Sequence, residues 1–119
     1  MNLKLRANDC RVKLPTRNSF YCCLEAYSCE NFLVPPGNRR IIDLRFNIEL
    51  EDDGACDDIY FLSMSGCKIM ERVTTEKSSI KLILVNEHLD RWLSIKKYDK
   101  VARIVIPPET TVTAILHNN

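Results

Sequence analysis

The stretch "RIIDLRFNIEL", Arg40–Leu50, decides the fold class of this sequence. Apolar and polar residues alternate along it, and the apolar set is Ile42, Leu44, Phe46, Ile48 and Leu50. A period of two is typical of a strand that buries one face and exposes the other. The pattern therefore predicts one long, half-buried strand that runs through the whole stretch.

Turn signals and further β patterns surround this strand. The "VPPGN" before it predicts a turn, and the "EDDGACDD" after it predicts an acidic loop. Shorter strands are predicted at Ile59–Met64, Ser79–Asn86, Trp92–Ile95, Val101–Ile106 and Thr110–Leu116. Short strands at close spacing, separated by turns, indicate an all-β sandwich, jelly roll or barrel. The one helical candidate is a turn around "NEHLDRW", so at most one short helical turn is expected.

The composition is that of a single globular domain over residues 1–119. The chain is 45% hydrophobic and 28% charged, and its formal net charge is +1. This balance gives no field that favours nucleic acid or an anionic membrane. The sequence has no apolar run long enough to span a bilayer, and its start lacks the apolar core of a signal peptide. We therefore expect a location in the cytoplasm, with the nucleus as a second compartment, and no secretion.

The residues that bind metals and phosphates are sparse. The six cysteines predict free, mostly buried thiols, because nothing in the sequence points to the secreted context that disulfides need. There is no C-x-x-C pair, and His88 and His117 are the only histidines, so no zinc site is expected. The acidic loop is interpreted as a solvated loop, with a hard divalent cation as the alternative. The three glycines are scattered, which excludes a glycine-rich phosphate loop.

The order of these elements resembles the dUTPase family, the trimeric all-β enzymes that hydrolyse dUTP to dUMP and pyrophosphate with magnesium. The stretch "CCLEAYS" is similar to the first family motif, alanine-glycine-x-aspartate-leucine-tyrosine-serine. Cys23 then takes the place of the glycine and Glu25 that of the aspartate. As in the family, a proline-proline-glycine turn follows and leads into the long strand.

The second and third motifs resemble the family pattern only in part. The second, proline-arginine-serine-glycine, is similar to "SMSG", in which Ser65 and Gly66 are retained and Met64 replaces the arginine. A thioether cannot hold phosphate as a guanidinium does. The third motif falls on "ERVTTEKSSI", with Val73 near the place of the catalytic aspartate and Glu76 near that of the tyrosine under the sugar.

The fourth motif, glycine-aspartate-arginine-isoleucine-alanine-glutamine, is similar to "YDKVAR", in which Tyr98 replaces the glycine and Arg103 the glutamine. The glycine-rich fifth motif has no counterpart, because no glycine follows Ile106. The resemblance implies a dUTPase-like jelly roll or distorted β-barrel that assembles as a homotrimer. The replaced residues imply a degenerate nucleotide site without catalytic residues, cofactor or bound metal.

A retained fold with a degenerate site predicts a non-catalytic protein that acts through protein–protein contacts. The resemblance extends to small adenoviral members of this kind, which engage host signalling or scaffold proteins and promote growth and survival through phosphoinositide 3-kinase. PDZ binding is not expected, because the sequence ends "LHNN" and not in a hydrophobic residue. The alternative is an active or altered nucleotide hydrolase or nucleotide-binding protein, with Mg²⁺ held by Glu25 and the acidic loop.

One exposed loop is predicted to contact a partner. It consists of Glu87, His88, Leu89, Asp90, Arg91 and Trp92. For Trp92 itself we expect packing in the core, with an exposed binding residue as the alternative, since tryptophan is enriched at such positions. In the last predicted strand, Val101, Ile104 and Ile106 are expected to pack in the core.

Overall fold

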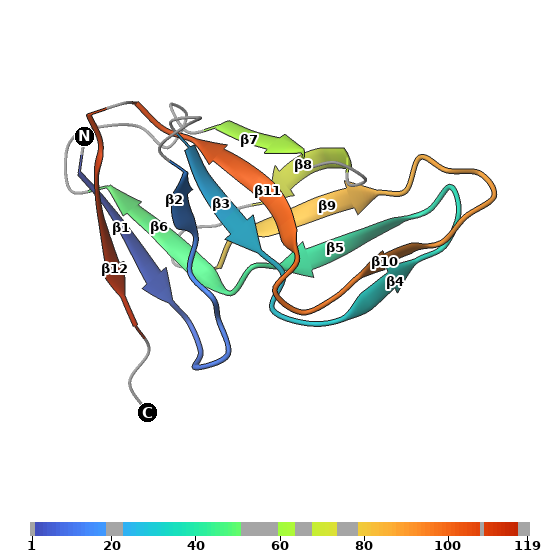
Figure 1. The fold of residues 1–119 in the computed structure, drawn as a ribbon, viewed down its shortest axis with the longest axis horizontal. Coiled ribbons are helices and arrows are strands. Elements are labelled where there is room, and N and C mark those ends of the chain that lie inside the picture. Colours follow the sequence, from blue (N-terminus) through green and yellow to red (C-terminus); the bar gives the residue numbers. More distant parts are fainter. Residues whose placement is uncertain are drawn as a thin grey trace.

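The computed structural model describes residues 2–18, 23–50, 60–63, 68–73, 79–107 and 109–116. Within these ranges every regular element is a strand (Figure 1). The strands are β1 (Asn2–Ala7), β2 (Thr16–Asn18), β3 (Cys23–Tyr27), β4 (Phe32–Val34), β5 (Arg39–Asp43), β6 (Phe46–Leu50), β7 (Tyr60–Ser63), β8 (Lys68–Val73), β9 (Lys81–Val85), β10 (Leu93–Ile95), β11 (Lys100–Val105) and β12 (Thr111–Ile115). The all-β prediction is therefore confirmed.

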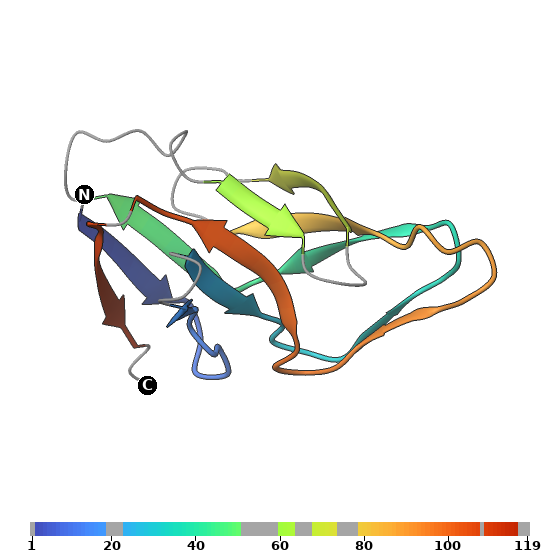
Figure 2. The same ribbon diagram turned by 45° about the horizontal axis from the view of Figure 1, so that its top comes forward.

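The strands form three sheets and one two-stranded ribbon. The sheets have the orders β12-β1-β6, β2-β3-β11-β7 and β5-β9-β8, and the ribbon pairs β10 with β4. Neighbouring strands are antiparallel, except that β12 pairs parallel with β1. Figures 1 and 2 show the ribbon extending beside β5 and β9, away from the sheet that holds the two ends of the chain.

One hydrophobic core joins all of these sheets. Its fully buried members include Leu5 and Phe46 from the first sheet, Leu24 and Ile104 from the second, Leu82 and Leu84 from the third, and Val34 from the ribbon. Burial of one such aliphatic or aromatic side chain contributes about 1.5–3 kcal/mol. Val101, Ile104 and Ile106 are all buried, as the sequence predicts. Leu33, Ile41 and Leu62 are apolar strand residues that are more than half exposed.

The prediction of one continuous strand over Arg40–Leu50 is wrong. The chain bends at Leu44 and Arg45 and forms two strands, β5 and β6. Ile42, Leu44 and Phe46 are all buried, so the alternating pattern is correct. The pairing partner changes at the bend, however: β5 pairs with β9, whereas β6 pairs with β1. Arg45 has a φ of 57°, in the left-handed region, and this conformation turns the chain from one sheet into the other.

The five shorter predicted strands are present as β7, β9, β10, β11 and β12, with small shifts at their ends. The stretch "NEHLDRW", the one candidate for a helical turn, contains no helix, which agrees with the expectation of at most one such turn. Asn86 instead makes a local turn, because its Oδ1 accepts a hydrogen bond of 3.0 Å from the backbone N–H of His88. The acidic loop lies outside the described residues.

No helix that could cross a membrane occurs in the described ranges. Of the cysteines in those ranges, Cys10 is exposed whereas Cys23 and Cys29 are buried, and all three are free thiols. The prediction of free thiols is confirmed for these three residues.

Candidate functional site

Two of the predicted site residues meet on one face of the β2-β3-β11-β7 sheet. Glu25 of β3 and Arg103 of β11 are directly paired in the antiparallel ladder. Thr16 pairs with Glu25 on one side, and Leu62 pairs with Arg103 on the other. Directly paired residues carry their side chains on the same face. The fold therefore brings the first and fourth motifs into one row of side chains.

The Glu25 carboxylate is held by groups of its own chain. Its Oε2 lies 2.8 Å from Nζ of Lys100, and its Oε1 accepts a hydrogen bond of 2.9 Å from Nδ2 of Asn18. These contacts lower the pKa of Glu25, chiefly through the hydrogen bond from Lys100, and they raise the pKa of Lys100. Glu25 is thus an ionised, buried carboxylate whose oxygens are bound by one cation and one amide.

The neighbouring side of this face is covered by the segment between β1 and β2. The hydroxyl groups of Tyr27 and Thr16 are 2.6 Å apart. The ammonium group of Lys13 lies 4.0 Å from the centroid of the Tyr27 ring, close enough for a cation–π contact. Tyr27 is buried, two residues from Glu25 in the same strand. The hydroxyl groups of Tyr27 and Thr16 are thus engaged within the chain.

The turn before β11 keeps the conformation that glycine would favour. The backbone N–H of Asp99 donates to the carbonyl oxygen of Lys96, and Tyr98, the third residue of this turn, has a φ of 71°. Tyr98 N–H donates to Ser28 O at 2.8 Å, and Ser28 N–H donates to Asp99 O at 2.9 Å. Tyr98 thus stands where the family pattern has a glycine, and it adopts a positive φ that glycine adopts more easily. The two hydrogen bonds with Ser28 hold the turn in this conformation.

The other predicted site residues are placed only in part. Ser63 ends β7 and directly precedes Met64, Ser65 and Gly66, which lie outside the described residues, as does Glu76. Val73 ends β8 and pairs with Lys81 in the β5-β9-β8 sheet. The structure therefore brings Glu25 and Arg103 together and places Val73 in a different sheet.

The predicted partner loop, Glu87–Trp92, is exposed at every residue. Its side chains include Leu89, 87% exposed, and Trp92, 61% exposed. The expectation that Trp92 packs in the core is wrong: Ile95 of the adjoining strand β10 is buried instead, and Leu93 packs against the core. Trp92 is exposed, as the alternative interpretation requires.

Hydrogen bonds fix this loop against the turn before β5. The backbone N–H of Gly37, a glycine with a φ of 69°, donates to His88 O at 2.9 Å. The Asn86 side-chain amide donates to Val34 O at 3.2 Å and to Arg91 O at 2.6 Å. The exposed apolar side chains of the loop are therefore carried on a backbone that is tied down at both ends.

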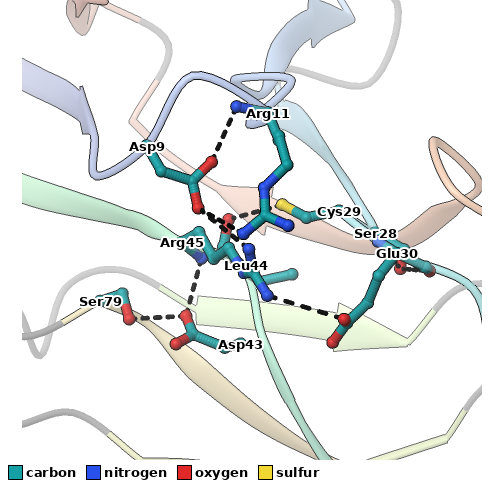
Figure 3. Close-up of polar contacts among 9 residues, drawn as sticks. All are labelled: Asp9, Arg11, Ser28, Cys29, Glu30, Asp43, Leu44, Arg45 and Ser79. Carbon is teal, nitrogen blue, oxygen red and sulfur yellow. Dashed lines mark hydrogen bonds and ion pairs between the residues drawn. The ribbon is translucent and has the colours of Figure 1, made fainter. Parts of the chain in front are cut away.

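A polar network that no sequence motif indicates lies at the bend between β5 and β6 (Figure 3). Nη1 of Arg45 lies 3.0 Å from Oδ2 of Asp9, and Nη2 lies 3.6 Å from Oε2 of Glu30. Asp43 accepts hydrogen bonds from the Arg45 backbone N–H at 2.8 Å and from the Ser79 hydroxyl at 2.6 Å. These contacts hold the left-handed conformation of Arg45 from three segments of the chain.

Three groups at this bend have shifted pKa values: the pKa of Asp9 is lowered, and the pKa values of Arg45 and Cys29 are raised. The backbone N–H of Arg11, 2.7 Å from Asp9, is the main cause that lowers the pKa of Asp9, and the Arg45 guanidinium adds to it. Burial raises the pKa of the Cys29 thiol, which donates to Leu44 O at 3.2 Å. The arrangement has the features of a structural clamp, because each polar group has a partner in the chain.

No group of three or more histidine, cysteine, aspartate or glutamate side chains suited to a metal ion occurs in the described part of the chain. On the Glu25 face the surrounding donors are cationic or amide groups. Hard divalent cations need several oxygen ligands. Among the described residues, the Glu25 face therefore supplies one carboxylate to a cation, and the acidic loop of the alternative lies outside those residues.

Among solved structures, the chain is similar to phage dUTPases. A variant of the Staphylococcus bacteriophage 80alpha dUTPase with dUpNHpp matches with a TM-score of 0.69 at 15% identity, over 89% of each chain. A variant dUTPase from phage phi11 of S. aureus, whose structure describes the coordination of a structural Mg(II) ion, matches with a TM-score of 0.68 at 16% identity, over 89% of this chain and 90% of that one.

These likenesses define the class of fold. The chain has the jelly-roll type β fold of the dUTPases, as the sequence motifs predict. A second variant of the 80alpha enzyme covers 98% of this chain and 92% of its own, with a TM-score of 0.68 at 15% identity. No family model matches the sequence, and no curated protein matches it. At this identity the similarity establishes the fold, and the activity has to be argued from the site.

Proposed function

We propose that this chain is a non-catalytic protein of the dUTPase fold that acts through contacts with other proteins. The observation that carries the proposal is the state of Glu25, whose carboxylate is already bound by Lys100 and Asn18 and faces Arg103. A carboxylate that serves a nucleotide site has to be available to metal or water. The replacement of the phosphate-binding arginine by Met64 supports the same conclusion.

The proposal includes the kind of partner. The size of the chain and the stretch "ENFLVPPGNRRIIDLRFNIEL" resemble the adenoviral early-region-4 first open reading frame protein, a non-catalytic relative of dUTPases. By this resemblance, the protein is a viral early protein that binds host signalling or scaffold proteins and promotes growth and survival through phosphoinositide 3-kinase. Its place would be the host cytoplasm, with the nucleus as a second compartment. The phage 80alpha dUTPases, described as controlling the transfer of virulence genes, are a precedent for regulation by this fold.

The surface that we propose for host contacts is the Glu87–Trp92 loop. Leu89 and Trp92 are exposed and supply apolar area, while Glu87, Asp90 and Arg91 surround them with charge. Partner surfaces commonly combine an apolar centre with a polar rim. The hydrogen bonds of Gly37 and Asn86 limit the entropy that such a loop would lose on binding. A homotrimer, as the family resemblance implies, would carry this loop three times.

The test of the proposal is the hydrolysis of dUTP by the purified protein. We expect a rate at background with Mg²⁺ present, and no heat of binding when dUTP or dUMP is titrated in a calorimeter. The contrary result is hydrolysis well above background that Ser65→Ala abolishes. That result would establish the alternative, an active or altered nucleotide hydrolase that uses Mg²⁺. Light scattering on the same sample tests the homotrimer.

A further inference from the structure

A groove lies between the β4-β10 ribbon and β5, at the opposite end of the ribbon from the partner loop. Its volume is about 590 Å³, and its lining residues are Asn31, Phe32, Leu33, Arg40, Ser94, Ile95 and Lys96. Volumes of this order are typical of sites that take a small ligand or a few side chains of a peptide. Neither the nucleotide motifs nor the partner loop account for this groove.

The groove has a fixed apolar base. Phe32 and Ile95 are buried and are paired with each other across the ribbon. Leu33 is 53% exposed, so its side chain offers apolar surface to a ligand. An apolar base with an exposed apolar neighbour gives a ligand side chain an area to bury.

The charged residues of the groove are both cations. The Arg40 guanidinium lies over the Phe32 ring, 5.2 Å from its centroid, and Lys96 follows Ile95 at the end of β10. No carboxylate of the described residues forms an ion pair with either cation. At this distance the guanidinium makes a cation–π contact with the ring. Its N–H groups can still form the two parallel hydrogen bonds of a carboxylate.

The carboxylates that flank the groove in the sequence, Glu30 and Asp99, both bind groups of their own chain. Glu30 faces Arg45, with 3.6 Å between Oε2 and Nη2. Asp99 accepts a hydrogen bond of 2.8 Å from the backbone N–H of Lys96, inside the turn before β11. The lining residues thus include two cations and no carboxylate, while Asp99 lies at the edge of the groove, on the backbone of Lys96. The charge of the lining itself favours a negatively charged ligand.

The Tyr98 turn forms an edge of the same surface. The backbone N–H of Lys97 donates to Oδ1 of Asn31, a groove residue, at 2.7 Å. Tyr98 follows directly, 46% exposed and with a φ of 71°. Left-handed conformations of residues other than glycine persist where the surroundings enforce them, and they cluster at functional sites.

We propose that this groove binds an acidic segment of a partner protein, with carboxylates on Arg40 and Lys96 and an apolar side chain on Leu33 and Phe32. The proposal rests on the proposed function, because it names the chemistry of a partner and a second surface for it. Complementary charge sets the orientation and specificity of such a contact, while the apolar base adds affinity.

The experiment is a fluorescence-anisotropy titration with a labelled peptide of alternating glutamate and leucine. We expect it to bind the wild type, and Arg40→Glu to weaken binding by at least about ten-fold. Arg39→Glu is the matched control: it makes the same change in charge on the opposite face of the same strand, and we expect a change below about two-fold. A peptide with glutamine in place of glutamate should bind much more weakly. Thermal unfolding of each variant reports whether it is folded. Peptide binding by Lys96→Glu provides a second test of the groove.

Three results overturn the proposal. Equal loss in Arg40→Glu and Arg39→Glu would mean that net charge alone attracts the peptide. Equal binding of the glutamine peptide would remove the role of the carboxylates. Binding of inorganic phosphate that depends on Arg40, without binding of the glutamate peptide, would assign the groove to a phosphorylated ligand. The dUTP assay on the same preparations separates these outcomes from failure of the proposed function, because hydrolysis does not depend on the peptide.

Discussion

Glu25 and Arg103 stand opposite each other in the ladder of β3 and β11, and the Glu25 carboxylate is bound by Lys100 next to that pair. In the dUTPase pattern these two positions carry an aspartate and a glutamine. The chain thus has an internal ion-pair cluster where the resemblance implies nucleotide chemistry. This difference in functional groups on a scaffold of the same fold is the basis of the proposed non-catalytic role.

The first prediction concerns the charge of Glu25. Glu25→Gln should lower the melting temperature at neutral pH, because Lys100 and Arg103 lose the anion that they surround. The pKa of Glu25 is lowered in the folded protein, so its stabilising effect is present above the ordinary glutamate pKa and is lost as the pH falls through the lowered value. Melting curves of wild type and variant should therefore converge in acid. Glu87→Gln, which breaks the exposed pair with Lys68, is the control and should have little effect. A difference in melting temperature between wild type and Glu25→Gln that persists unchanged in acid would contradict a stabilising role for the ionised Glu25.

The second prediction uses the backbone of Tyr98. Tyr98→Gly should be more stable than Tyr98→Ala by about 1 kcal/mol, because glycine adopts a positive φ without the steric cost that Cβ imposes. Both variants lose the contact of the Tyr98 ring with Lys97, so their difference isolates the backbone. The free energy of unfolding in urea measures it. Equal stability of the two variants would mean that the turn relaxes when the ring is removed.

The sequence pattern was sufficient to predict which residues of the stretch Arg40–Leu50 are buried. It was not sufficient to predict that the chain bends and changes its pairing partner. Ile42, Leu44 and Phe46 point inward as the alternation predicts. Periodicity records which side of a strand faces the core, and it contains no information on the neighbouring strand. The change of partner from β9 to β1 depends on Arg45, whose left-handed conformation is enforced by Asp9 from a distant segment. No local pattern reveals that contact.

The sequence motifs indicated some residues of the candidate site. Positions that depend on how the strands pack against one another could not be predicted. The motifs drew attention to Glu25 and Arg103, which the fold pairs directly, and to the glycine position now held by Tyr98, which has a positive φ. Trp92 was misjudged, because a lone tryptophan beside a strand is equally compatible with either face. Strand β1 carries alternating Leu3, Leu5 and Ala7, a signal that was present in the sequence and was missed. The groove at Arg40 needs the ribbon and β5 side by side, which only the fold provides.

The third prediction concerns the clamp at the bend. Asp9→Asn should lower the free energy of unfolding by about 1 kcal/mol at neutral pH, because the charge-assisted bonds from Arg45 and the Arg11 backbone are weakened. Urea unfolding measures the loss. In an Arg45→Gly background the same substitution should cost less, since one of its two partners is then absent. An equal cost in both backgrounds would show that Asp9 acts without Arg45.

The fourth prediction concerns the thiols. Iodoacetamide should modify the exposed Cys10 in the native protein much faster than the buried Cys23 and Cys29. At Cys29 burial also raises the pKa of the thiol, so the reactive thiolate is scarcer there at a given pH. Peptide mapping by mass spectrometry after short exposure assigns the modified residues. In urea all three should react at similar rates, and fast native labelling of Cys29 would contradict the packing around Leu44.

The last prediction separates partner binding from folding. Trp92→Ser should change the free energy of unfolding by less than about 0.5 kcal/mol, because Trp92 is 61% exposed. Leu84→Ala, at a fully buried position, should cost about 2–5 kcal/mol in the same assay. If the Glu87–Trp92 loop is the host-contact surface, immobilised Trp92→Ser should lose a host protein that the wild type captures from lysate. Leu62→Ser removes a comparably exposed apolar side chain from β7, in a different sheet, and should retain that protein. Loss of the host protein by both Trp92→Ser and Leu62→Ser, or by neither variant, would place the contact elsewhere on the surface.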